Sequence, residues 1–359
     1  MMASLDPIKT GHKRSRVLIV DDSAVARSII GELVGKESDL VVAGYAADAV
    51  QAMKAIKQGG IDVITLDIEM PDTDGLTLLR QIMASKPLPV LMVAGSNPRQ
   101  AARTLQALAD GAVHFIEKHR GDAQSFEHFA KKFMLALRAT SQTKVAHSIH
   151  VKTNPCAAKA PLARFRQDYQ IIAIGASTGG TEAIKVLLSQ LPIDCPPVVV
   201  CIHMPLSFTS SYADRLDSQL EHDVQLLSDG EILRRGCVYV VPGDQQGGIV
   251  RTRSGQLLGL LRASSAAEIY RPSVDGLFTS IAHYKAIRCA AFILTGMGKD
   301  GTLGATALQA NSTLNGTKIW CQSEETCVIF GMPKSALEAG AITACLPIQT
   351  ITSGLFAEP

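Results

Sequence analysis

Residues 171–184 read IIAIGASTGGTEAI, and this stretch decides the class of fold. Apolar residues lead into a run of small residues and then into a segment with helical periodicity. A buried strand that turns sharply into a helix is the repeating unit of parallel α/β folds. Such a turn serves either as a glycine-rich loop around a phosphate or as a strained turn that exposes a serine. Ser177 lies in the middle of the turn. It is a bystander in a phosphate-binding loop and the nucleophile in a strained turn.

The composition describes a folded protein with two domains. The chain has 359 residues, of which 47% are hydrophobic and 19% are charged, and this length is large for one hydrophobic core. The formal net charge of +2 indicates neither a nucleic-acid-binding surface nor a polyanionic substrate. The second domain also lacks a basic recognition helix, so we expect no nucleic-acid partner.

The apolar segments and the cysteines indicate a cellular compartment. No segment reaches the roughly 18 apolar residues of a membrane span, and no signal-peptide core follows the basic N-terminal tail. Most of the eight cysteines lie within apolar runs, and none forms a C-x-x-C pair. We expect a reduced cytoplasmic protein with no direct membrane insertion and no structural zinc.

Hydrophobic periodicity predicts two doubly wound, mainly parallel-sheet α/β domains joined by a linker. Residues 15–138 alternate between apolar, β-branched segments and helical stretches, which predicts a flavodoxin-like domain. The alternation stops at residues 139–168, which carry prolines and basic residues and are typical of a linker. It resumes over residues 169–359, where GIVRTR (residues 248–253) is one of the expected strands of a Rossmann-like domain.

Charged residues end three strands of the first predicted sheet. Asp21 and Asp22 end LIVDDS, Asp67 ends VITLD, and Lys118 ends HFIEK. The carboxyl ends of parallel strands meet at one edge of a sheet, so these side chains are expected to converge. Clustered carboxylates favour a hard cation such as Mg²⁺, and the most exposed one can then attack a phosphoryl donor. Alternatively, such aspartates are helix N-caps, an explanation that suits Asp22 best.

The motifs VDDSAVAR, DVITLDIEMPDTDGL and GAVHFIEK resemble those of response-regulator receiver domains. The resemblance implies that Asp67 is the phospho-acceptor, that Asp21, Asp22 and Asp67 hold Mg²⁺, and that Lys118 contacts the phosphoryl group. It also implies a histidine kinase as the phosphoryl donor.

Two positions depart from the receiver pattern. Receivers usually carry Thr or Ser at the end of the fourth strand, where this chain has Ala94, and the proline that often follows the lysine is His119. We expect Asp67 to be phosphorylated nonetheless, with a conformational response that is weakened or rerouted through Ser96.

The turn at Ser177 fits a nucleophile better than a nucleotide site. A dinucleotide fingerprint needs a bare central glycine and a carboxylate after the second strand, but the chain has Ser177 and His203 there. The turn does match G-x-S-x-G, and a serine needs a base and an orienting acid. His203 and Asp300 follow two further strands, which predicts that all three converge, although a lone histidine or a turn aspartate has simpler explanations. The order Ser…His…Asp differs from that of α/β-hydrolases.

The second domain contains six further motifs, which are IGASTGGTEAI, IHMPLSFTSSYADRL, VYVVPGD, RPSVDGLF, ILTGMGKDG and FGMPKSALEAGA. From about residue 169 onward the chain therefore resembles the CheB family of chemotaxis protein-glutamate methylesterases, in which these motifs occur in the same order. A receiver, a linker and this domain are also the family's architecture. Gln246 stands where the family usually has histidine and Ser323 where aspartate is common, so we expect altered loop packing or substrate fit there.

The resemblance implies a serine hydrolase. Ser177 is then the nucleophile, His203 the general base and acid, and Asp300 the orienting carboxylate, while the Met297 N–H faces the oxyanion and Thr178 supports His203. The implied substrate is a glutamate methyl ester, or a glutamine, on the cytoplasmic helices of a chemoreceptor, with no cofactor for hydrolysis. We expect the receiver to cover the cleft until it is phosphorylated. A catalytically silent, phosphorylation-dependent binding module is the alternative.

Overall fold

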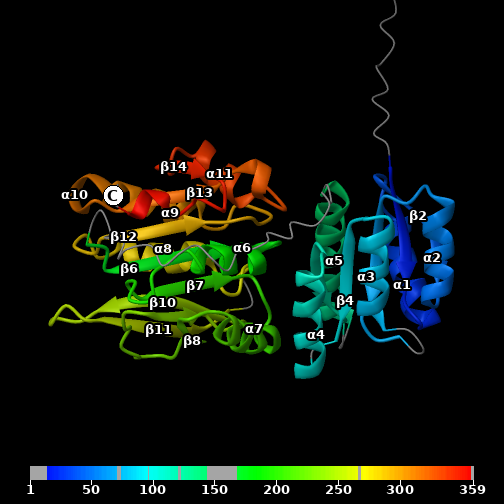
Figure 1. Ribbon diagram of the computed structural model, residues 1–359, viewed down its shortest axis with the longest axis horizontal. Coiled ribbons are helices and arrows are strands. Elements are labelled where there is room, and N and C mark those ends of the chain that lie inside the picture. The colour runs from blue at the N-terminus through cyan, green and yellow to red at the C-terminus, as the bar shows by residue number, and fades with distance from the viewer. Residues whose placement is uncertain are drawn as a thin grey trace, which may run out of the picture. The chain divides into compact units, whose positions relative to one another are not determined.

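The computed structural model describes residues 14–70, 74–95, 97–119, 123–143, 168–265 and 268–356. These residues form two α/β domains, each built on its own parallel sheet (Figure 1). The predicted fold class is therefore confirmed. Most of the expected linker lies outside the described residues. Within the described ranges, no helix combines the length and the apolar character that a bilayer span requires.

The first domain is a five-stranded sheet in the order β2-β1-β3-β4-β5, the flavodoxin-like arrangement. Its strands are β1 (Ser15–Val20), β2 (Leu40–Ala46), β3 (Val63–Asp67), β4 (Val90–Ala94) and β5 (His114–Glu117). Its helices are α1 (Ala24–Gly35), α2 (Ala49–Gln58), α3 (Gly75–Ser85), α4 (Pro98–Ala109) and α5 (Ala123–Gln142). Side chains of β1, β3 and β4 form a buried cluster with α1 and α5.

Local capping explains where several of these helices begin. Asp48 caps α2 by accepting a hydrogen bond from the Gln51 N–H, and Asn97 caps α4 in the same way. Pro98 occupies the first turn of α4, where its missing N–H costs nothing. These caps fix where the chain turns into a helix after β2 and β4.

The second domain is a seven-stranded sheet in the order β14-β13-β12-β6-β7-β9-β8. Its strands are β6 (Ile171–Ala176), β7 (Val198–Ile202), β8 (Asp223–Leu226), β9 (Cys237–Val240), β12 (Cys289–Ile293), β13 (Lys318–Gln322) and β14 (Ala344–Leu346). The chain leaves β6 toward β7 and later returns to β12 on the other side. Ligands of open α/β sheets bind at the carboxyl ends of the strands beside such a reversal.

Helices and one hairpin complete this domain. The α-helices are α6 (Gly180–Leu188), α7 (Leu206–Gln219), α8 (Val274–Ala282), α9 (Thr302–Ala310), α10 (Ser312–Asn315) and α11 (Met332–Glu338). Two short 3₁₀ helices are η1 (Glu324–Thr326) and η2 (Ser353–Leu355). The segment expected as a strand at residues 248–253 falls mostly in β10 (Gln245–Arg251), which pairs antiparallel with β11 (Leu257–Ala263), outside the parallel sheet. Alternation alone does not distinguish these two settings.

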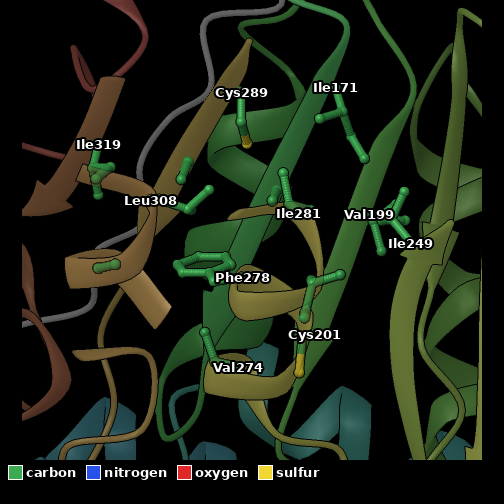
Figure 2. Packing of buried hydrophobic residues seen from close by; sticks show 14 of the residues in the cluster. Ile171, Val199, Cys201, Ile249, Val274, Phe278, Ile281, Cys289, Leu308 and Ile319 are labelled. Carbon is green, nitrogen blue, oxygen red and sulfur yellow. The ribbon is translucent and has the colours of Figure 1, made fainter. Parts of the chain in front are cut away.

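The core of the second domain lies between the sheet and α8. Val274, Phe278 and Ile281 of α8 pack toward Ile171, Cys201 and Cys289 of the strands (Figure 2). All of these side chains are almost fully buried, and removal of apolar surface from water is the main stabilising contribution to such a core. The packing fixes the first turn of α8 under the carboxyl end of the sheet. The seven described cysteines are free thiols.

Candidate active site and acidic pocket

Ser177 lies in the sharp turn between β6 and α6. The Ser177 N–H donates to the Thr295 carbonyl at 3.0 Å, and the Ser177 carbonyl accepts from the Gly180 N–H at 2.8 Å. Gly179 has a φ of +78°, in the left-handed region that favours glycine. A Cβ at Gly296 would lie 2.8 Å from the Ser177 Cβ, so the neighbouring loop also needs a glycine to approach the serine.

His203 is brought next to this turn by strand pairing. β6 and β7 pair Ala176 with Ile202, and the His203 N–H donates to the Ala176 carbonyl at 3.2 Å. Ser177 and His203 are therefore the residues that follow two paired positions. The His203 side chain is only 14% exposed. Its ring stacks on Tyr270 with centroids 4.6 Å apart and an interplanar angle of 15°.

Asp300 follows β12, and its carboxylate contacts the His203 imidazole. Its Oδ2 lies 2.7 Å from His203 Nε2. The carboxylate also sits at the N-terminus of α8, where backbone N–H groups have no partners within the helix. Its other donors are Ser273 Oγ (2.9 Å), Val274 N–H (2.7 Å), Asp275 N–H (3.0 Å) and Gly301 N–H (3.1 Å).

These contacts keep Asp300 ionised. Burial alone would raise its pKa, but the hydrogen bond and charge of His203, together with the N–H groups of Asp275 and Val274, outweigh burial and hold the pKa below its usual value. With Nε2 bonded to Asp300, the Nδ1 atom of His203 is the ring nitrogen left for a serine proton. Among the described residues, no hydrogen bond reaches Ser177 Oγ, and such catalytic contacts often tighten only when substrate binds.

The loop after β12 lies against the Ser177 turn and is held by backbone hydrogen bonds. The carbonyl of Gly296 accepts from the Gly331 and Met332 N–H groups at 3.1 and 2.8 Å, which fixes the loop. Within the described ranges, the Met297 N–H donates to no other group. Thr178 is 1% exposed, and its Oγ1 has no hydrogen-bond partner among the described residues.

Sequence reasoning missed two residues that hold the histidine and the aspartate, Tyr270 and Ser273. Ser273 belongs to the RPSVDGLF motif, but its N-cap role and its contact with Asp300 were not foreseen. Gln246 is buried and contacts Tyr270 and Ser273 without touching the His203–Asp300 pair. Ser323 is also buried, and its N–H donates to the Leu346 carbonyl.

The charged residues of the first domain form one pocket. Lys118 Nζ lies 2.7 Å from Asp67 Oδ2 and 3.1 Å from Asp21 Oδ2. Asp21, Asp22 and Asp67 each offer a carboxylate oxygen, and these atoms lie within 4.8 Å of one another. Asp21 and Asp67 are buried, while Asp22 is exposed. The expectation that the attacking carboxylate is the most exposed one therefore does not fit Asp67. Three carboxylates at this spacing are typical of a Mg²⁺ site.

Burial and charge act in opposite directions on Asp67. Burial raises its pKa, the hydrogen bond and charge of Lys118 offset only part of that effect, and the Asp21 charge adds to it. The pKa of Lys118 is lowered by burial but raised overall by Asp67 and Asp21. The pocket therefore holds a protonated lysine beside a carboxylate that needs further positive charge.

The two departures from the receiver pattern occupy defined places. Ala94 ends β4 and is completely buried, with no hydroxyl to offer. The His119 ring lies against Phe126 and Phe129, with centroid distances of 5.3 and 5.9 Å. Ser96 lies outside the described residues.

Two known families match separate segments of the chain. Residues 17–129 match the response regulator receiver domain, and residues 172–355 match the CheB methylesterase family. The chain is 40% identical, over 91% of its length and 93% of the relative, to a protein-glutamate methylesterase/protein-glutamine glutaminase 2 of Shewanella oneidensis. The corresponding Pseudomonas aeruginosa protein is 39% identical over 94% of this chain and 95% of its own.

Among solved structures, the crystal structure of the Thermotoga maritima CheB methylesterase catalytic domain is 39% identical. It covers 52% of this chain and 97% of its own, with a TM-score of 0.48. A receiver sheet with an acidic pocket, followed by a second α/β domain with serine, histidine and aspartate at its strand ends, defines a response regulator with an enzymatic output domain. The chain belongs to the CheB family, in which a receiver domain precedes a methylesterase domain.

Proposed function

We propose that this chain hydrolyses glutamate γ-methyl esters, and deamidates glutamines, on the cytoplasmic helices of chemoreceptors. The observation that carries the proposal is the 2.7 Å contact between His203 Nε2 and Asp300 Oδ2, made at the strand ends beside Ser177. Two relatives named as methylesterase/glutaminase match over nearly their whole length, which supports the same chemistry here. A cytoplasmic location follows from such a substrate.

The proposed reaction proceeds by acyl transfer. Ser177 Oγ attacks the ester carbonyl while His203 Nδ1 accepts the serine proton, and Asp300 stabilises the imidazolium that forms. The histidine then returns the proton to the methoxide, and methanol leaves. Water attacks the acyl-enzyme with help from the same histidine and releases glutamate. With a glutamine substrate, the leaving group is ammonia.

The oxyanion of the tetrahedral intermediate needs fixed donors. The Met297 N–H donates to no other group in the described chain and lies in the loop that contacts Ser177 through Gly296, so we assign it this role. One such donor contributes about 3 kcal/mol to transition-state stabilisation. Thr178 is next to the serine, and its Oγ1 has no hydrogen-bond partner in the described part of the chain, so we assign it to support His203.

In the receiver we propose that Asp67 accepts the phosphoryl group of a histidine kinase. Asp21, Asp22 and Asp67 fit Mg²⁺ by their donor chemistry and spacing, and Mg²⁺ there would neutralise charge on the transferring phosphoryl group. Lys118 contacts the product from the same pocket. We propose that the receiver spans residues 15–138, the linker 139–168 and the catalytic domain 169–359. The receiver restrains hydrolysis until it is phosphorylated.

Methanol release from a methylated receptor fragment tests this function. Wild type should release methanol, and Ser177→Ala should release none above background, while its folding by circular dichroism is unchanged. A folded wild type that releases neither methanol nor ammonia from any receptor fragment would instead favour the catalytically silent binding module.

A further inference from the structure

A single buried amide joins the two residues that hold the His203–Asp300 pair. Gln246 lies in β10 and is 5% exposed. Its Nε2 donates to the Tyr270 carbonyl at 2.8 Å, and its Oε1 accepts from the Ser273 N–H at 2.9 Å. The side chain therefore bridges both ends of the four-residue segment 270–273.

Each end of that segment contacts one member of the pair. The Tyr270 ring stacks on the His203 imidazole, with centroids 4.6 Å apart. Ser273 Oγ donates to Asp300 Oδ1 at 2.9 Å. A displacement of the segment would therefore move the support of the base and the support of the acid together.

We propose that Gln246 is a positioning residue, whose carboxamide keeps His203 and Asp300 aligned through Tyr270 and Ser273. The inference rests on the proposed hydrolysis, although Gln246 itself touches neither substrate nor reacting atoms. A neutral amide suits this place, because it donates and accepts at the same time without titrating. A hydrophobic side chain of similar length would fill the space but leave the Tyr270 carbonyl and the Ser273 N–H unpaired.

The test compares Gln246→Met and Gln246→Asn with a matched control in the full-length chain. Met keeps the length and loses both hydrogen bonds, whereas Asn keeps a neutral amide that is one methylene too short to span both partners. The control is Ser280→Ala, which removes another link between β10 and α8: Ser280 Oγ accepts from the Ile249 N–H at 2.9 Å and contacts neither member of the pair.

Two readouts separate positioning from stability. The first is kcat and KM for methanol release, where Gln246→Met should lower kcat about tenfold, equivalent to about 1.4 kcal/mol, and leave KM within about twofold. The second is the rate at which a fluorophosphonate probe labels Ser177, which should fall in parallel and needs no receptor. Gln246→Asn should lie between Met and wild type, and Ser280→Ala should match wild type in both readouts.

The outcomes are distinct. If the folded Gln246 variants keep wild-type kcat and labelling rate and lose only thermal stability, the positioning role is wrong. If Gln246→Met does not fold, the kcat and the Ser177 labelling rate of Gln246→Asn decide the question in the same way. If no receptor fragment is hydrolysed but Ser177 labelling still depends on Gln246, the proposed function fails while the positioning role stands.

Discussion

Asp67 and Asp300 are both buried carboxylates at strand ends of parallel sheets, yet their surroundings differ. Asp300 accepts hydrogen bonds from His203, from the Ser273 hydroxyl and from three backbone N–H groups, and its pKa is lowered. Among the residues that the structure describes, the partners of Asp67 are Lys118 and the Glu69 N–H, and burial leaves its pKa raised. A carboxylate with all its partners in place is a fixed orienting group. A buried carboxylate with fewer partners, such as Asp67, is suited to a cation and to covalent modification.

The largest expected effect comes from removing the Asp300 charge. Asp300→Asn keeps the shape but not the charge, so the histidine loses both its tautomer control and the stabilisation of its imidazolium. We expect kcat for methanol release to fall about 10⁴-fold. Asp217→Asn is the matched control, because the hydrogen bond that Asp217 accepts within the described chain comes from the Val224 N–H, away from the His203–Asp300 pair. A loss of less than tenfold would show that Asp300 does not orient the base.

The next effect concerns the Mg²⁺ that Asp21, Asp22 and Asp67 are proposed to bind. At about ten times its dissociation constant, Mg²⁺ should raise the free energy of unfolding of the receiver by about 1.4 kcal/mol. Asp22→Asn removes one ligand without touching the Lys118 pairs and should abolish most of this gain. Asp48→Asn, at the N-cap of α2, should leave it intact. Thermal unfolding with and without MgCl₂ measures both, and an equal gain in Asp22→Asn would contradict the site.

The smallest effect is a pair of opposite pH dependences of the free energy of unfolding, because the pKa of each carboxyl group differs between the folded and the unfolded chain. The pKa of Asp300 is lowered on folding, so its stabilisation is fully present above about pH 5 and is lost as the pH falls through the folded pKa. The pKa of Asp67 is raised, so its contribution is present below the unfolded pKa and is lost as the pH rises through the folded pKa.

Without Mg²⁺, the stability deficit of Asp300→Asn relative to wild type should therefore grow from pH 3 to pH 6. That of Asp67→Asn should shrink over the same range. Hydrogen-exchange mass spectrometry in urea reads each domain separately. Parallel trends in the two variants would contradict the contrast between the two carboxylates.

The difference between the two sites also explains what the sequence could predict. Ser177, His203 and Asp300 were expected together because each follows a strand, and parallel strands share their carboxyl edge. The same rule predicted that Lys118 lies beside Asp67. The sequence does not predict that Tyr270 lies in the site, because this residue comes from a loop without periodicity.

The antiparallel hairpin is a second feature that the sequence pattern does not predict. Gln246 enters β10 in a hairpin that alternation could not distinguish from a strand of the main sheet. Its partners in segment 270–273 are defined only by the packing of that hairpin beside α8. Side-chain contacts of this kind depend on tertiary structure rather than on local pattern.

The most direct test of the account measures methanol release by the full-length chain with and without beryllofluoride, a phosphoryl mimic, in wild type and in Asp67→Asn. Beryllofluoride should stimulate wild type, and Asp67→Asn should hydrolyse at the unstimulated wild-type rate under both conditions. That result would show that Asp300 and its partners carry out the hydrolysis and that Asp67 controls its rate. Equal stimulation of both proteins, or loss of basal hydrolysis in Asp67→Asn, would contradict this division.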